Sequence, residues 1–315
     1  MSAPEESSQV RRFFKRHDIV MFYLIAFALT WFGWLAADRA MVIFGPDSNW
    51  VELIAEGHLY MIFYPVIAIL GGARGPLVSA FIIYHVNYGR AGSKALLKKV
   101  LNWRVALPWY ILAFGLPILI KYGAFYFNVW FLGGTFIPDL ETASILTILI
   151  GFGSELIPTG GQEEVGWTGF AQLRLQQHTS VVNATLIKAL LGWVWHLPLF
   201  LVFPWDSSFG GNIWLFLFFY IAIAFILTWL FNNTNSVLIP ALFHASFNTV
   251  GSFAQLYSTS LDASTLTVVM IGLLAYIIVV FAFVKFGKNL TRKELPQLDA
   301  NRHPDEFESR KAAST

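Results

Sequence analysis

Long apolar runs follow one another along almost the whole chain and restrict the folds that it can adopt. They fill most of the sequence between Ile19 and Phe286. An α-helix rises about 1.5 Å per residue, so roughly 20 apolar residues cross the ~30 Å hydrocarbon core of a bilayer. We therefore predict an all-α fold, a polytopic membrane helical bundle of about eight transmembrane helices.

The predicted spans are separated by polar loops or turns. They cover residues 19–37, 58–86, 107–130, 143–157, 181–203, 213–231, 237–253 and 266–286. The second is long for one crossing and is interrupted at Gly75 and Pro76, so it forms either one kinked span or two shorter segments. Residues 90–104 interleave basic and apolar side chains at helical spacing, which predicts an amphipathic helix in the membrane interface.

The composition fits a membrane protein and excludes several kinds of site. Only 13% of the 315 residues are charged, whereas soluble domains usually contain about 25%. The chain has no cysteine, which excludes disulfides, thiol nucleophiles and cysteine metal sites. Nothing in the sequence indicates an oligomeric state.

Charged residues alternate in sign between the predicted loops, and this alternation predicts the orientation. Basic residues occur in the N-terminal flank, in residues 90–104, in the stretch with Arg174 and Lys188, and after residue 286. The intervening loops carry acidic residues. Because basic loops stay in the cytosol, we expect an integral, multi-pass protein with both termini cytosolic.

Three divisions of the chain follow from this pattern. Residues 1–18 are predicted to be a cytosolic basic flank, residues 19–286 a single transmembrane catalytic domain, and residues 287–315 a disordered cytosolic tail. The short basic flank suits anionic membrane lipid, and we expect no binding to nucleic acid.

A few ionisable or amide side chains interrupt the apolar runs and mark the candidate site. A charge at bilayer depth costs on the order of 3 kcal/mol, so it needs a partner or a function. The exceptions to the apolar pattern are Arg74, Lys121, Glu155, Glu163, Glu164, His196, His244 and Asn248. We expect the adjacent carboxylates to meet His196, His244 and Asn248 in one buried site. Glu155 is either a structural partner in its own span or touches this site.

These residue types can hydrolyse a peptide bond. A carboxylate and a histidine can hold and deprotonate a water, and a second histidine with an amide can donate hydrogen bonds to the developing oxyanion. His244 and Asn248 are four residues apart, so they lie on one face of a helix. Alternatively, His196, His244 and Glu163 bind Zn²⁺ and leave one position open for water.

Three short motifs in this order resemble the CAAX protease and bacteriocin-processing family of intramembrane proteases, also called the ABI or type II CAAX prenyl endopeptidase family. That family has EExxxR, then FxxxH, then HxxxN or HxxxD. The corresponding residues here are Glu163-Glu164-Val165-Gly166-Trp167-Thr168, Gly192-Trp193-Val194-Trp195-His196 and His244-Ala245-Ser246-Phe247-Asn248. The resemblance covers residues 70–285.

The resemblance implies an endopeptidase that cuts a peptide or prenylated peptide near the cytosolic membrane face. It implies that Glu163 and His196 activate the water, that His244 and Asn248 bind the oxyanion, and that Glu164 supports the site. It leaves open whether the histidines bind zinc.

Two positions depart from the family motifs. Thr168 stands where the family has arginine, which removes a cation and favours altered activity or a non-catalytic relative. We hypothesise that Arg74 supplies this charge from another helix. Gly192 stands where the family has phenylalanine, and we expect Trp193 or Leu191 to fill the volume.

Other functions use the same residue types. A catalytically inactive relative could act as a scaffold or immunity protein, and a proton-coupled carrier also needs buried carboxylates and histidines. Other intramembrane proteases fit poorly, because the predicted spans contain no aspartate, the chain has no HExxH, and residues 151–154 lack the GxSx spacing of rhomboids.

Overall fold

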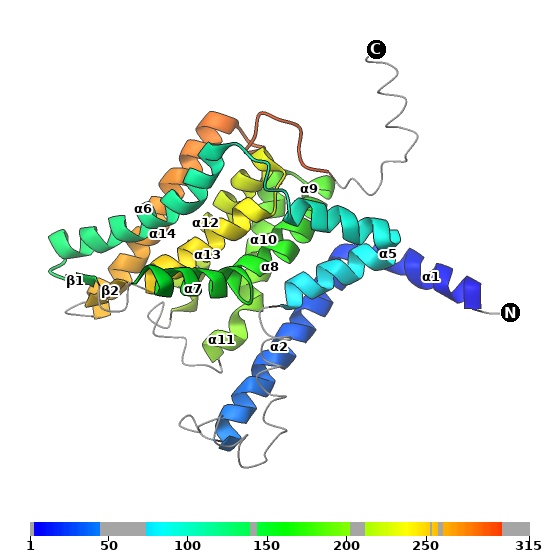
Figure 1. Ribbon diagram of the computed structural model, residues 1–315, viewed down its shortest axis with the longest axis horizontal. Helices are drawn as coiled ribbons and strands as arrows, with labels where there is room; N and C mark the ends of the chain where they lie inside the picture. The colour runs from blue at the N-terminus through cyan, green and yellow to red at the C-terminus, as the bar shows by residue number, and fades with distance from the viewer. Residues whose placement is uncertain are drawn as a thin grey trace.

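A computed structural model describes residues 3–44, 74–138, 144–201, 212–252, 254–257 and 261–297 of this protein. Within these residues the chain is helical apart from two short strands (Figure 1). The elements are α1 (Ala3–Arg16), α2 (Asp18–Phe44), α5 (Gly75–Val100), α6 (Leu107–Phe131), β1 (Thr135–Pro138), α7 (Ile145–Leu156), α8 (Gly160–Gly166), the π-helix η2 (Trp167–Gln172), α9 (Leu173–His178), α10 (Val181–Trp195), α11 (Leu197–Leu201), α12 (Ile213–Thr234), α13 (Leu238–Ser252), β2 (Ala254–Tyr257) and α14 (Leu261–Phe286). The predicted helical bundle is confirmed.

Polar residues at the ends of the apolar runs define several helix boundaries. Ser144 and Ser180 begin α7 and α10, and each side chain accepts a hydrogen bond from a backbone N–H of the first turn. Asn212 does the same for α12. Such caps satisfy N–H groups that have no partner within the helix. Asn235 ends α12 in the left-handed conformation, with φ 50°, which is common at helix C-termini.

Five stretches in the described residues are long and apolar enough to cross a membrane. They are Asp18–Ala36, Leu107–Phe131, Val181–Leu201, Ile213–Thr234 and Thr265–Phe286. Leu238–Val250 is a shorter apolar helix. The chain is therefore an integral membrane protein that crosses the bilayer several times, while the count of about eight spans stays a prediction.

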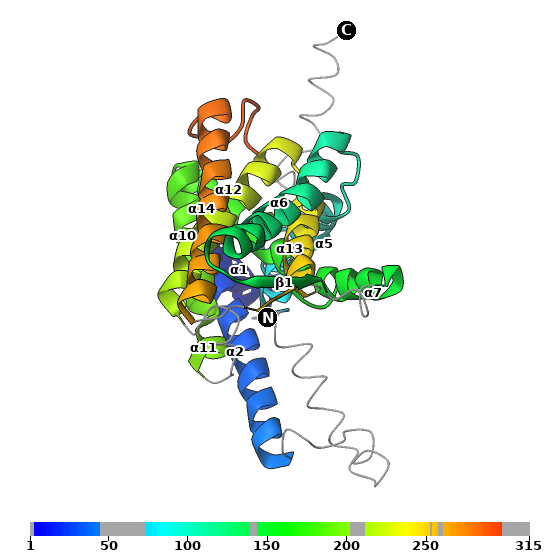
Figure 2. The same ribbon diagram turned by 90° about the vertical axis from the view of Figure 1, so that its left-hand side faces the viewer.

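Two of the predicted spans differ in the structure. Residues 143–157 contain only the 12-residue helix α7, which is about 18 Å long and therefore too short to cross ~30 Å of hydrocarbon by itself. None of the α7 residues is buried, and α7 projects from the side of the bundle (Figure 2). The predicted span 58–86 is described only from Arg74 onward. There it continues across a kink at Gly89, with φ 63°, into the predicted interfacial helix, and both form α5.

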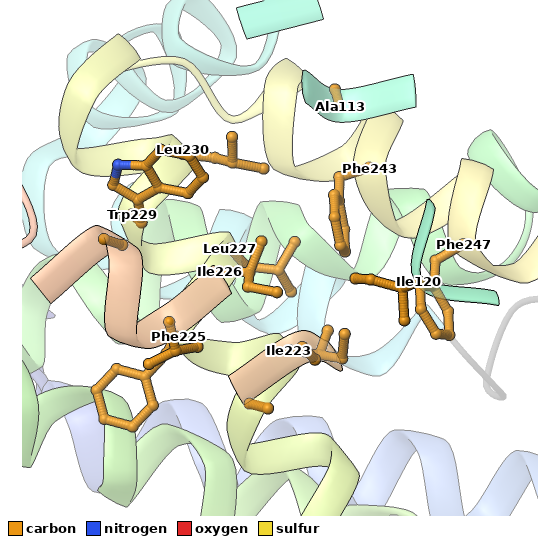
Figure 3. Packing of buried hydrophobic residues seen from close by; sticks show 14 of the residues in the cluster. Ala113, Ile120, Ile223, Phe225, Ile226, Leu227, Trp229, Leu230, Phe243 and Phe247 are labelled. Carbon is orange, nitrogen blue, oxygen red and sulfur yellow. The ribbon is translucent and has the colours of Figure 1, made fainter. Parts of the chain in front are cut away.

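Two apolar clusters hold the bundle together. The first joins α6, α12, α13 and α14, with residues such as Ile120, Leu227 and Phe243 fully or almost fully buried (Figure 3). The second joins α2, α5, η2 and α10 around Trp167, Phe170 and Trp195. The segment with the paired carboxylates lies where the two clusters meet, because α8 packs against both α5 and α13.

The strands β1 and β2 form a small antiparallel pair with Thr135 opposite Tyr257. They follow α6 and α13 in the chain. This pair is the one exception to the all-α prediction among the described residues.

The first residues after α14 are ordered and pack against the end of α12. Leu290 is buried, and its carbonyl oxygen accepts a hydrogen bond of 2.7 Å from the Asn233 side chain. Lys293 donates to the Asn233 carbonyl oxygen at 2.8 Å. The predicted disorder from residue 287 is therefore wrong for residues 287–297, because apolar Leu290 and the polar groups around it find partners on α12. Residues 298–315 lie outside the described part.

Candidate functional site

The paired carboxylates lie on α8 in the most enclosed part of the chain. Every residue from Gly160 to Leu173 is buried, and Glu163 and Glu164 are 6% and 2% exposed. Adjacent residues on a helix point about 100° apart, so the two side chains meet different neighbours. Glu163 accepts a long hydrogen bond of 3.4 Å from the Trp167 indole. Glu164 accepts a hydrogen bond from the Thr168 hydroxyl.

Glu164 also reaches α13. Its Oε1 lies 3.0 Å from Nδ1 of His244. Four residues later, Asn248 donates from Nδ2 to Oε2 of Glu155 at 2.9 Å. The predicted common face of His244 and Asn248 is therefore directed at carboxylates on α8 and α7.

Gly160, the first residue of α8, lies against both of these side chains. A Cβ atom added to Gly160 would be 2.8 Å from Nε2 of His244 and 2.7 Å from Nδ2 of Asn248. Both nitrogens therefore converge on one place beside Gly160. Only glycine leaves this place open.

Glu155 contacts one of the predicted site residues, which is the second of the two roles open to it from the sequence. Besides Asn248, its carboxylate accepts a hydrogen bond of 2.8 Å from Thr159. It also interacts electrostatically with Lys121 of α6, whose Nζ lies 4.3 Å from the ring centre of Phe247. The signal in the sequence was an acidic residue in an apolar run eight positions before Glu163.

His196 lies at the C-terminal end of α10. Its Nδ1 is 2.7 Å from the carbonyl oxygen of Gly192. A carbonyl only accepts, so Nδ1 carries a proton and Nε2 of a neutral ring is left as a base. The neighbouring Trp195 ring contacts Trp167, with ring centres 5.4 Å apart, and Trp167 in turn bonds Glu163.

The structure thus brings the predicted site residues together to different degrees. Hydrogen bonds join Glu164 to His244 and Asn248 to Glu155. His244 interacts electrostatically with Glu163 and with His196. Within the described residues, no hydrogen bond joins His196 to Glu163.

The space beside Gly192 is filled from another helix. A Cβ atom on Gly192 would be 2.4 Å from the hydroxyl oxygen of Tyr220 on α12. The Tyr220 ring also lies 5.3 Å from the His196 ring. The prediction that Trp193 or Leu191 fills this volume is wrong, because Trp193 turns toward α12 and donates to the carbonyl oxygen of Ile213 at 2.9 Å.

The hypothesis for the missing motif arginine is also wrong in its choice of residue. Arg74 precedes α5 and is half-buried. It forms no ion pair with Glu163 or Glu164 in the part of the chain that the structure describes. Lys188, which we counted as a cytosolic basic residue, is instead 3% exposed inside the bundle and interacts electrostatically with Glu164.

The zinc alternative has no preformed site among the described residues. No three His, Cys, Asp or Glu side chains there come together in an arrangement that could hold a metal ion. Nδ1 of each site histidine has a partner, Gly192 or Glu164, and such a partner is also compatible with metal binding through Nε2.

Two comparisons with known proteins bear on this site. Residues 141–250 match a family described as type II CAAX prenyl endopeptidase Rce1-like, and this match includes all three motifs. The chain is also 31% identical over 93 residues to CAAX prenyl protease 2 of Methanococcus maripaludis. That alignment covers 27% of this chain and 34% of the relative, so about a third of the relative is matched. The resemblance that the motifs predicted is confirmed.

Proposed function

We propose that this protein is an intramembrane endopeptidase that hydrolyses a peptide bond with a water activated by Glu163 and His196. The observation that carries the proposal is the convergence of His244 and Asn248 on one place beside Gly160, at the start of the helix that carries both glutamates. The similarity of residues 141–250 to CAAX prenyl endopeptidases supports the same reaction.

Glu163 and His196 have free capacity to take a proton. Within the described residues, the hydrogen bond to Glu163 comes from Trp167 and is long, at 3.4 Å. Oxygen lone pairs of this carboxylate are therefore available to a water. The hydrogen bond from His196 to Gly192 leaves Nε2 as a second base. General-base catalysis of this kind contributes about 10²–10⁴-fold.

His244 and Asn248 provide the donors for the oxyanion. An imidazolium whose Nδ1–H bonds Glu164 has its Nε2–H left to donate. Nδ2 of the Asn248 amide donates to Glu155, and the same nitrogen lies beside Gly160. Donors that are held in place before the reaction stabilise the transition state, because they need no reorganisation as the charge develops.

The substrate in this proposal is a membrane-associated peptide, with or without a prenyl group, cut near the cytosolic membrane face. The competing functions are a scaffold or immunity protein without activity and a proton-coupled carrier. A carrier uses buried ionisable residues too, but it has no need for two donors that converge on one place.

Cleavage of quenched fluorescent peptides by the purified protein tests the proposal. The peptides should be offered with and without a farnesyl group, in lipid nanodiscs. Hydrolysis that is lost in Glu163→Ala and in His244→Ala is the expected result. Cleavage that persists in both variants would refute the site, and proton-driven uptake into vesicles without cleavage would establish the carrier.

A further inference from the structure

Lys188 is a buried cation that the reaction described above does not use. It lies in the middle of α10 and is 3% exposed. Its Nζ donates a hydrogen bond of 3.3 Å to the Thr228 hydroxyl on α12. That hydroxyl is neutral, and a neutral oxygen does not offset the cost of burying a full charge. We therefore expect a carboxylate close to Lys188.

Glu164 is the carboxylate that acts on Lys188. The two groups interact electrostatically, and no other carboxylate does so with Lys188 among the described residues. Glu164 is itself 2% exposed. Its direct partners are the Thr168 hydroxyl and Nδ1 of His244.

A row of buried polar side chains occupies the region between Glu164 and Lys188. Thr168 bonds Glu164, and Gln172 follows four residues later in η2. Gln172 donates to the Thr185 hydroxyl at 3.2 Å, and Thr185 donates to Thr228 at 3.2 Å. Thr228 is the residue that Lys188 bonds. This row places η2, α10 and α12 around one polar region with a carboxylate at one end and an ammonium at the other.

Lys121, a half-buried lysine of α6, interacts with a different carboxylate. Lys121 interacts electrostatically with Glu155, which lies on the Asn248 side of the site. Each of the two lysines thus has its own glutamate.

We propose that Lys188 is a positioning residue whose charge balances Glu164 and thereby holds Glu164 against Nδ1 of His244. Lys188 touches neither the water nor the peptide, and its effect on catalysis passes through the Glu164–His244 contact. The Thr168 hydroxyl can bond Glu164 but brings no charge, and the His244 imidazolium faces both Glu163 and Glu164. Lys188 of α10 therefore supplies a second positive charge for the two carboxylates. The catalytic part of this inference rests on the proposed function.

A double-mutant cycle on melting temperature tests the pairing without any assay of activity. The purified full-length protein is compared with Lys188→Met, Glu164→Gln and the double variant in the same nanodiscs. We expect Lys188→Met to lower Tm by about 5 °C or more, because the buried Glu163 and Glu164 carboxylates then have one cation fewer near them. In the Glu164→Gln background the same substitution should cost little, because the carboxylate that interacts with Lys188 is absent.

Lys121→Met is the matched control, since it removes a lysine that faces another carboxylate. Its Tm loss should be the same with Glu164 and with Gln at that position. Equal losses for Lys188→Met in both backgrounds would overturn the pairing. If Lys188→Met does not fold, the double variant decides: a folded double variant supports the pairing, and an unfolded one refutes it.

Kinetics test the positioning role separately. Lys188→Met should lower kcat at least tenfold with little change in KM. Lys188→Arg, which keeps the positive charge, should retain most of the wild-type kcat. If the Tm loss of Lys188→Met depends on Glu164 but kcat is unchanged, the positioning role is overturned. If the wild-type protein cleaves no peptide, the proposed function fails, while the Tm cycle still decides the pairing of Lys188 with Glu164.

Discussion

Nδ1 of His244 lies 3.0 Å from Oε1 of Glu164, which ties α13 to α8 across 80 residues of sequence. This contact orients the imidazole, so that Nε2 lies beside Gly160. A carboxylate that bonds the far nitrogen of a functional histidine commonly fixes its ring and its tautomer.

The first prediction concerns this contact. Glu164→Gln keeps the size of the side chain but removes its charge, so it should no longer stabilise a doubly protonated His244. We expect kcat to fall about 10²-fold, the range seen on loss of one oxyanion donor, with KM nearly unchanged. Steady-state cleavage of the quenched peptide measures both constants. A variant with full kcat would show that His244 needs no carboxylate partner.

The second prediction concerns Gly160. Gly160→Ala places a methyl group within 3 Å of Nε2 of His244 and Nδ2 of Asn248. We expect at least tenfold lower kcat, because the substrate carbonyl loses its place between the donors. Gly153→Ala on α7 is the matched control, since a Cβ there meets nothing within 4 Å. Cleavage rates that are equal in the two variants would contradict the position of the oxyanion site.

The third prediction tests the packing of Tyr220 against Gly192. Gly192→Ala brings a methyl group 2.4 Å from the Tyr220 hydroxyl oxygen, and overpacking of this kind costs about 1–3 kcal/mol. Adding Tyr220→Phe removes that oxygen and should recover part of the lost Tm. Gly115→Ala, where a Cβ meets nothing within 4 Å, should leave Tm unchanged. No recovery in the double variant would show that another group fills this space.

The fourth prediction separates Glu155 from the rest of α7. Glu155→Ala removes the acceptor that orients the Asn248 amide. A hydrogen bond to a charged group contributes about 1.5–3 kcal/mol, so we expect kcat to fall about 10–100-fold. Ser154→Ala, one residue earlier, serves as the control, because it removes a hydroxyl that donates to the Gly151 carbonyl oxygen. The idea fails if both variants cleave the peptide at the wild-type rate.

The fifth prediction addresses the zinc alternative. No three His, Cys, Asp or Glu side chains in the described residues are placed so that they could hold a metal ion together. We therefore expect activity to survive treatment with 1,10-phenanthroline. Mass spectrometry should find less than one zinc per purified chain. One equivalent of zinc that disappears together with activity in His196→Ala would establish the metal site instead.

Much of the fold could be predicted because apolar length is a local property of the chain. Residues 107–130 and 213–231 were expected as spans, and α6 and α12 cover them completely. The prediction for residues 143–157 failed for a non-local reason. The apolar run looks like a crossing, but its helix ends at Leu156, and the chain turns at once into the buried α8.

The partners of the site residues were harder to predict than the residues themselves. Spacing alone placed His244 and Asn248 on one face of a helix. Spacing could not decide whether Arg74 or Lys188 interacts with Glu164, because that choice depends on how α5 and α10 are rotated against α8. The replacement of a motif side chain by Tyr220 likewise depends on contacts between helices that the sequence pattern does not contain.

The exposure of α7 has a practical consequence for experiments. This helix has no buried residue, and Leu146, Leu149 and Ile150 are each more than 60% exposed. Its apolar side chains are therefore open to whatever surrounds the protein, and Glu155 near its end bonds Asn248 of the proposed site. We therefore expect the membrane mimetic to affect the cleavage rate as well as solubility, so that rates measured in short-chain detergent and in a bilayer differ.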